Sequence, residues 1–156
     1  LQNRGELFSL DESHPNVYAP GKRPFHTIIP AFVMKDGEPF MSFGLMGGAM
    51  QPQGHVQVLV NVIDFGMDVQ TAGDAARFNH NGGRQPTGVD EDLLGTLLVE
   101  PGVPAETTET LRARGHRVEV DGTGAPFGGY QAIMRLPDGV YAGATEMRKD
   151  GTVVAW

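Results

Sequence analysis

The chain has 156 residues, of which 40% are apolar and 20% are charged, a composition typical of a globular domain. Its net charge is −7 and its basic residues form no stripe, which argues against a nucleic-acid partner. The absence of cysteine excludes thiol catalysis, disulfides and cysteine-ligated zinc. No apolar run reaches the roughly 18 residues that a membrane-spanning helix needs, so we expect no membrane partner.

The length suits one domain that covers residues 1–156. The first residue is Leu1 rather than Met, and the opening "LQNRGELFSL" resembles a stretch from the middle of a longer chain. We therefore expect a processed chain or a fragment of a longer protein. The cysteine-free composition fits either the cytoplasm or the periplasm of a bacterium and leaves the compartment open.

In the first part of the chain, residues 1–25 lack periodicity and are expected to form a loop. Residues 26–34, "HTIIPAFVM", predict a strand, which Pro30 restricts to a sheet edge or a bulge. "KDGE" predicts a hairpin turn, and residues 39–45 predict the returning strand.

Two helices are expected to follow. The first begins at Pro52 and stops before Gly66, with apolar residues at helical spacing: Val56, Leu59, Val60 and Ile63. Asp68 is placed to cap a second helix over residues 69–78.

In the second half of the chain, strands are predicted on either side of a third helix. A surface loop with an acidic cluster is expected over residues 80–95, and Pro104 opens a third helix that Gly115 ends. A glycine-rich loop covers residues 121–129. Strands are expected over residues 96–100, 116–120, 130–136, 140–145 and 152–156, the last three forming a meander. The pattern predicts an α+β fold, with antiparallel strands and two or three helices on one face.

The pair Gly47–Gly48 lies between a predicted strand and a predicted helix. Glycine N–H groups can point into a site from backbone conformations that other residues avoid, and two such donors can hold the oxyanion of a tetrahedral intermediate. Two alternatives stay open. The pair can be a bend that lets helix and sheet pack closely, or an anion-binding turn at a helix N-terminus. The chain has neither GxxxxGK[ST] nor GxGxxG, which weakens a phosphate site.

Other chemistry-bearing residues are few. There is no GxSxG or SxxK motif, so no nucleophile is evident. "GKRPFHTIIP" puts His26 and Thr27 at a strand start, where either side chain could bind a ligand or simply a loop. We expect no metal and no other cofactor, because no metal-ligand spacing occurs among the five histidines, which are His14, His26, His55, His80 and His116.

Several stretches in order resemble the C-terminal part of the small subunit of the γ-glutamyltranspeptidase family. They are "LQNRGELFSL", "GKRPFHTIIPAFVMKDGEPFMSFGLMGGAMQPQGHVQVLVNVIDFGMDVQTAGDAARF", "LLVEPGVPAETTETLRARGHRVEV", "GGYQAIM" and "YAGATEMRKDG". The resemblance covers nearly the whole chain. It implies an N-terminal-nucleophile hydrolase fold, a four-layer αββα sandwich of which this chain forms a part.

The resemblance also implies an activity. Family members cut themselves before a threonine, whose hydroxyl then attacks γ-glutamyl or related acyl amides with its own amine as the base. Water or an acceptor amine resolves the acyl-threonine. That threonine would lie upstream of Leu1, so the chain alone is expected to be inactive. The implied partners are the large subunit, the missing N-terminal part of the small subunit and a small-molecule acyl amide. Gly47 and Gly48 match the pair whose N–H groups hold the oxyanion.

In typical members the two residues after Arg-Pro-x contact the substrate carboxylate, and here they are His26 and Thr27. Leu7 stands where those members carry an acid for the substrate amine, and the side chain of Glu6 would point away in an extended stretch. Arg4 replaces a glutamine-like residue and can bind a carboxylate bidentately. The resemblance therefore implies acyl groups with a carboxylate and no free amine, such as glutaryl amides. The alternative function is a non-catalytic module that binds an anion at the glycine turn.

Overall fold

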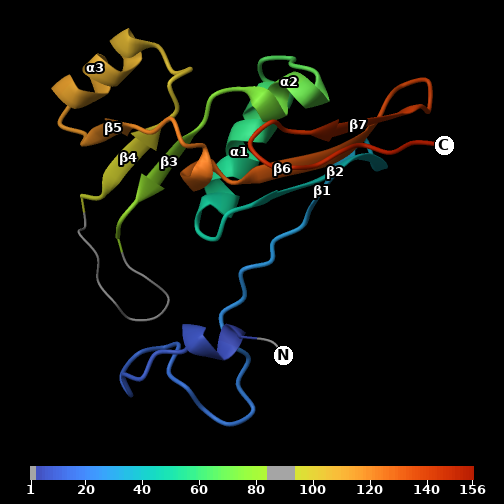
Figure 1. The fold of residues 1–156 in the computed structure, drawn as a ribbon. Coiled ribbons are helices and arrows are strands. Elements are labelled where there is room, and N and C mark those ends of the chain that lie inside the picture. Colours follow the sequence, from blue (N-terminus) through green and yellow to red (C-terminus); the bar gives the residue numbers. More distant parts are fainter. Residues whose placement is uncertain (1–2, 84–93) are drawn as a thin grey trace.

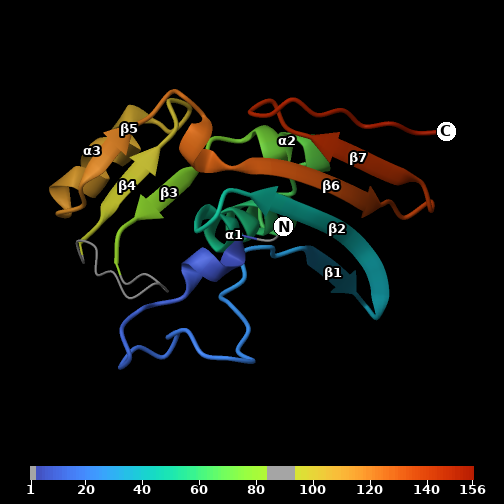
Figure 2. The same cartoon turned by 60° about the horizontal axis from the view of Figure 1, so that its bottom comes forward.

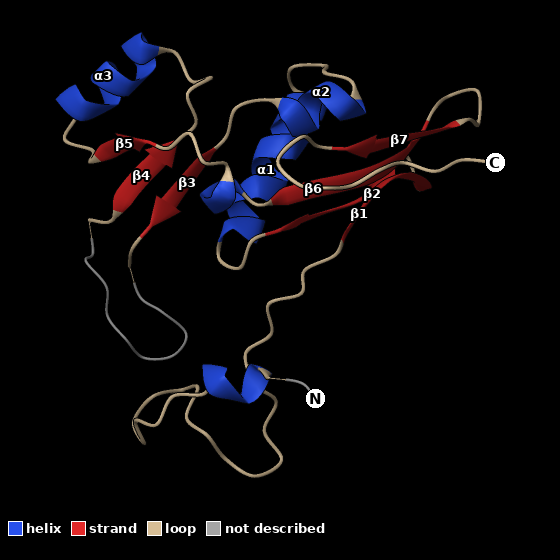
Figure 3. Ribbon diagram, in the orientation of Figure 1, coloured by secondary structure: helices blue, strands red, loops and turns tan. Residues whose placement is uncertain are grey.

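A computed structural model describes residues 3–83 and 94–156 of the chain, and these form two sheets with three α-helices (Figures 1 and 3). The larger sheet has the order β1-β2-β6-β7 and is antiparallel throughout. Its strands are β1 Ala31–Lys35, β2 Glu38–Met46, β6 Gly129–Arg135 and β7 Tyr141–Thr145. The helices are α1 Met50–Ile63, α2 Val69–Asp74 and α3 Ala105–Ala113, and two 3-10 turns are η1 Arg4–Leu7 and η2 Ala125–Phe127. The predicted α+β fold with three helices is confirmed.

The core lies between one face of the larger sheet and the helices α1 and α2 (Figure 2). Alternate side chains of β2 point inward, as the period of a strand requires. The buried cluster is Met41, Phe43, Leu45, Met50, Val58, Val62, Val69, Ala72, Tyr130, Ala132, Met134 and Ala144. Burial of this apolar face, rather than intrinsic helix propensity, holds α1 in place.

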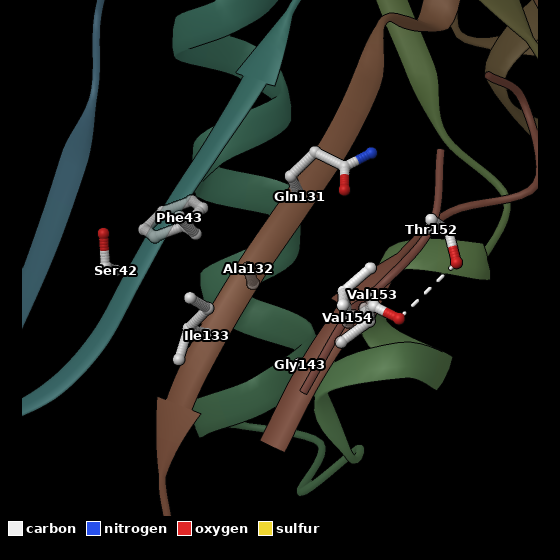
Figure 4. A pocket seen from close by; sticks show the side chains of 10 residues that line it. Ser42, Phe43, Gln131, Ala132, Ile133, Gly143, Thr152, Val153 and Val154 are labelled. Carbon is white, nitrogen blue, oxygen red and sulfur yellow. Dashed lines mark hydrogen bonds between the residues drawn. The ribbon is translucent and has the colours of Figure 1, made fainter. Parts of the chain in front are cut away.

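The opposite face of the larger sheet is open. Phe32, Ser42 and Ile133 are paired across β1, β2 and β6, so their exposed side chains form one row on this face. A cavity of about 350 Å³ lies between this face and residues 152–154 of the C-terminal segment (Figure 4).

The second sheet has the order β3-β4-β5, with β3 Phe78–Asn81, β4 Thr96–Val99 and β5 Val118–Val120. The strands β3 and β4 are antiparallel, whereas β4 and β5 are parallel. This pair departs from the antiparallel pattern that we expected. A parallel neighbour needs a crossover connection, and α3 supplies it between β4 and β5.

The predicted strand over residues 152–156 is wrong, and the expected meander is reduced to the β6–β7 hairpin. The C-terminal segment crosses the open face of the sheet instead of pairing with its edge. Val153 packs on Gly143, where an added Cβ would lie 2.5 Å from Val153 Cγ1. Val153 therefore lies over the face of β7 at a residue without a side chain, and no ladder of backbone hydrogen bonds joins residues 152–156 to the described strands of the sheet.

Other boundaries differ by a few residues. Residues 26–30 are not part of a strand, because β1 begins only after Pro30. As Pro30 indicated, β1 is an edge strand, and its register shifts between Val33 and Met34. Helix α1 begins at Met50, two residues before Pro52.

The remaining segments differ from the predictions in both directions. Helix α2 ends at Asp74, short of residue 78, because β3 starts at Phe78. The turns η1 and η2 fall in segments that we expected to be loops. The first residues of the predicted loop 80–95 belong to β3, and its acidic cluster at residues 90–92 lies outside the described residues.

Candidate active site

The glycine pair forms the turn between β2 and α1. Strand β2 ends at Met46, and α1 begins at Met50. Gly47 has a φ of 134° and Gly48 a φ of 59°, both in the region that residues with a Cβ seldom adopt. Both glycines are exposed. The backbone of this turn is therefore accessible at the N-terminus of a 14-residue helix.

The carbonyl and N–H groups of the turn have different roles. The Gly47 carbonyl accepts from the Met50 N–H at 3.1 Å, and the Gly48 carbonyl accepts from the Gln51 N–H at 3.2 Å. Neither the Gly47 N–H nor the Gly48 N–H donates a hydrogen bond to any acceptor within residues 3–83 and 94–156. Two exposed donors beside the positive end of a helix macrodipole can bind an oxyanion.

Close packing accounts for one glycine of the pair. A Cβ added to Gly47 would lie 3.1 Å from Gly128 Cα and 3.2 Å from Met50 Cβ. A Cβ added to Gly48 would meet nothing within 4 Å. The alternative of a bend that lets helix and sheet pack closely therefore explains Gly47 and leaves Gly48 unexplained.

The structure brings one predicted binding residue to this turn. The buried side chain of Gln51 donates through Nε2 to the Thr27 carbonyl and, at 3.2 Å, to the Gly48 carbonyl. Thr27 is half-buried, while His26 beside it is exposed and accepts from the Ile28 N–H through Nδ1 at 3.1 Å. The His26–Thr27 segment therefore lies next to the glycine turn.

The structure does not join Arg4 to this site. Arg4 lies on η1, which Figure 1 shows apart from both sheets, and its Nη1 donates to Asn3 Oδ1 at 3.1 Å. The role of Arg4 stays a prediction. Glu6 and Leu7 belong to the same 3-10 turn. The assumption of an extended stretch, on which we based the direction of the Glu6 side chain, is therefore wrong.

Helix α1 also holds the strand that leads into the turn. His55 is buried, and its Nε2 accepts from the Leu45 N–H at 3.2 Å. Its ring meets Phe43 edge-on, with ring centroids 5.0 Å apart. Burial lowers the pKa of His55, because desolvation disfavours the charged imidazole. The neutral form is the one that can accept from a backbone N–H.

Two further glutamines of α1 attach the helix to the second sheet. Gln57 exchanges two hydrogen bonds with the backbone of Phe78, both at 2.9 Å. Gln53 does the same with His80, at 3.0 and 2.8 Å. These amides pair with the free edge of β3 as a neighbouring strand would.

The sequence reasoning missed the polar residues of α1. The signal that could have found them is "QPQGHVQ", which carries polar residues at positions 51 and 55, four apart on one face of the helix. Polar residues on the buried face of a helix need partners inside the protein.

A buried ionic cluster, composed of Arg77, Glu100, Glu146 and Arg148, lies behind the turn. Arg77 Nη2 is 3.0 Å from Glu146 Oε2, and Arg148 donates to both Glu146 and Glu100. Arg77 also donates through Nη1 to the Phe127 carbonyl at 2.8 Å, next to the Gly128 that packs on Gly47. The cluster thereby fixes the backbone against which the turn rests.

Within the described ranges, no group of three or more His, Asp or Glu side chains could hold a metal ion. In that same part of the chain, no helix has the length and apolar character to cross a membrane.

An exposed two-donor turn at a helix N-terminus, held on a mixed helix and sheet scaffold, can hold an oxyanion of the kind that acyl transfer forms. The γ-glutamyltranspeptidase family model matches residues 1–156, and the chain belongs to this family. The glutathione hydrolase-like YwrD proenzyme of Bacillus subtilis strain 168 is 37% identical over 99% of this chain and 28% of its own length.

Solved structures agree with the family. The crystal structure of a cephalosporin acylase from Bacillus halodurans is similar with a TM-score of 0.85 and 46% identity, over 100% of this chain and 27% of that chain. An acivicin-inhibited gamma-glutamyltranspeptidase gives a TM-score of 0.78 and 28% identity, over 97% of this chain and 81% of that chain. These neighbours are N-terminal-nucleophile hydrolases, as the resemblance implied.

The chain spans only 25% to 28% of the length of the first curated relatives that it matches, so it corresponds to a part of such enzymes. These comparisons do not support the alternative of a non-catalytic anion-binding module, because the relatives are named hydrolases, acylases and transpeptidases.

Proposed function

We propose that this chain is the C-terminal part of the small subunit of an amide hydrolase or acyltransferase that works through an acyl-threonine intermediate. The 156 residues would act as a single domain of the small subunit. The nucleophilic threonine would lie upstream of Leu1, which makes the chain inactive by itself. The large subunit and the preceding part of the small subunit would complete the site. The word proenzyme in the name of the B. subtilis relative supports self-processing.

The proposal rests on the exposure and the hydrogen bonding of the Gly47 and Gly48 N–H groups. They are exposed, they have no acceptor within the described parts of the chain, and their carbonyls are already used by the first turn of α1. In the reaction, the threonine hydroxyl adds to the amide carbonyl carbon, and the carbonyl oxygen becomes negatively charged. Two fixed N–H donors stabilise that charge in the transition state without reorganisation.

The substrate class follows from the residues that the resemblance assigns to the acyl pocket. Thr27 lies beside Gly48 through Gln51, and the resemblance assigns His26 and Thr27 to the acyl carboxylate. Leu7, at the position where typical members carry an acid, offers no charge to an ammonium group, and by the resemblance the Arg4 guanidinium would bind a carboxylate once the missing part of the site is in place. We therefore propose glutaryl-type amides as better acyl donors than γ-glutamyl amides. The 46% identity to a cephalosporin acylase supports this choice.

The test uses the full-length gene product, purified beside a variant whose upstream threonine is replaced by alanine. Intact mass should give two fragments for the wild type and one uncut chain for the variant. Hydrolysis of glutaryl-p-nitroanilide and γ-glutamyl-p-nitroanilide then ranks the two donors. One uncut chain in both samples would overturn the threonine mechanism. Faster turnover of the γ-glutamyl donor would overturn the proposed substrate class alone.

A further inference from the structure

We propose that Gln51 is a positioning residue that couples the carboxylate-binding segment at Thr27 to the oxyanion turn at Gly48, and that this coupling sets the preference for carboxylate-bearing acyl donors. The inference rests on the proposed function, and it assigns a role to a residue that touches neither the reacting carbonyl nor the nucleophile.

The side-chain amide of Gln51 bridges two segments of the chain. Its Nε2 carries two hydrogens, and the two acceptors are the carbonyls of Thr27 and Gly48, which lie on different segments of the chain. Gln51 is 8% exposed, so water has little access to replace either bond. Removal of the amide would take this donor from the Thr27 carbonyl, whereas the Gly48 carbonyl would keep only the Gln51 backbone N–H. The two segments would then no longer share a fixed point.

Helix α1, which carries Gln51, is held firmly against strand β2. His55, one turn further along α1, accepts from the Leu45 N–H of β2. Gly54 lies against the same strand, where an added Cβ would be 2.6 Å from Leu45 Cδ1. The helix that carries Gln51 therefore cannot shift relative to β2 and to the glycine turn that follows it.

A fixed spacing between Thr27 and Gly48 matters for one kind of substrate. In a glutaryl amide, the carboxylate and the scissile carbonyl are separated by three methylene groups. Both ends can bind at once only if the two binding elements keep a matching separation. A pentanoyl amide has the same chain length and no carboxylate, so it needs the oxyanion turn and not the spacing. A displacement of about 1 Å can reduce catalysis by roughly 10²-fold when two groups must be held together.

The experiment compares Gln51→Met with Gln57→Met in the full-length, self-processed protein. Each variant removes one amide from the same helix. Gln57, however, contacts the backbone of Phe78 and neither segment of the site. The readout is the ratio of kcat/KM for glutaryl-p-nitroanilide over kcat/KM for pentanoyl-p-nitroanilide. We expect Gln51→Met to lower this ratio about tenfold or more, mainly through the KM of the glutaryl donor. Gln57→Met should leave the ratio within about twofold of the wild type.

A purely structural role would lower both activities together and leave the ratio unchanged, and that result would overturn the inference. Should Gln51→Met not fold, Gln51→Asn provides the same test, because it keeps an amide but is one methylene too short to reach both carbonyls. A wild-type enzyme without activity on either donor would refute the proposed function, which is a separate result from an active enzyme with an insensitive ratio.

Discussion

His55 and Leu45 are joined across the glycine turn: the imidazole Nε2 accepts the Leu45 backbone N–H at 3.2 Å. Leu45 is the second-last residue of β2, and His55 lies in the second turn of α1. The bond links the strand that enters the turn to the helix that leaves it. A protonated imidazole has no lone pair left to accept this bond, so the link depends on the neutral form of His55.

The first prediction concerns pH and the stability of this link. Burial holds the pKa of His55 below its usual 6.5, so between these two values the unfolded state binds more protons than the folded state. The free energy of unfolding is then highest above pH 6.5 and falls as the pH drops toward the folded pKa. Thermal unfolding of the full-length protein at pH 8 and at pH 5.5 measures this loss.

The variant His55→Gln is the control for this prediction. Its amide oxygen can still accept from the Leu45 N–H, but it does not titrate. The fall in melting temperature between pH 8 and pH 5.5 should be smaller in His55→Gln than in the wild type. An equal fall in both proteins would assign the pH dependence to other groups.

The second prediction concerns the buried ionic cluster. Glu146 is 2% exposed and balances Arg77 and Arg148, so Glu146→Gln leaves two guanidinium groups with too little negative charge around them. Loss of one partner from a buried ion pair costs about 3–5 kcal/mol. Urea unfolding of the full-length protein gives the change in the free energy of unfolding.

A matched exposed pair provides the comparison for Glu146. Arg135 Nη1 and Glu38 Oε2 are 3.3 Å apart with both side chains largely in water, so Glu38→Gln should cost about 1 kcal/mol or less. Equal effects of the two substitutions would contradict a special role for the buried cluster.

The third prediction concerns the open face of the larger sheet. Phe32, Met46 and Ile133 are each more than half exposed there, and a sheet face with such residues normally packs against another layer. In the sandwich implied by the family, a second sheet would cover it. We expect the isolated 156-residue chain to give a near-random circular dichroism spectrum or to bind a hydrophobic dye. Addition of the missing part should reverse both signals. A soluble chain that unfolds cooperatively without dye binding would contradict this expectation.

Local signals in the sequence predicted their elements well. Asp68 accepts from the N–H groups of Gln70 and Thr71, both at 2.9 Å, as a helix cap should. The hairpin at "KDGE" and the strand over residues 39–45 are also confirmed. In each case the residues that determine the structure are close together in the chain.

Contacts between segments far apart in the chain could not be predicted from the sequence. Gln51 and Thr27 are 24 positions apart, and no local pattern indicates that one amide bridges Thr27 to Gly48. Arg77 lies in the segment between α2 and β3, and Glu146 directly follows β7, so only the topology brings this pair together. Residues 152–156 have high strand propensity, yet they cross a sheet face, because the position of a segment depends on the whole fold.

The central claim is that the Gly48 N–H holds the oxyanion, and the most direct measurement is kcat of full-length Gly48→Pro beside Gly48→Ala on glutaryl-p-nitroanilide. Proline removes the N–H and, because its ring fixes φ at about −65°, also distorts the turn. Alanine keeps the N–H and meets nothing within 4 Å, although the φ of 59° costs it roughly 1–2 kcal/mol. Intact mass verifies that both samples are cleaved. We predict a loss of about 10²–10³-fold for proline and a much smaller loss for alanine. Equal turnover of the two variants would contradict the claim.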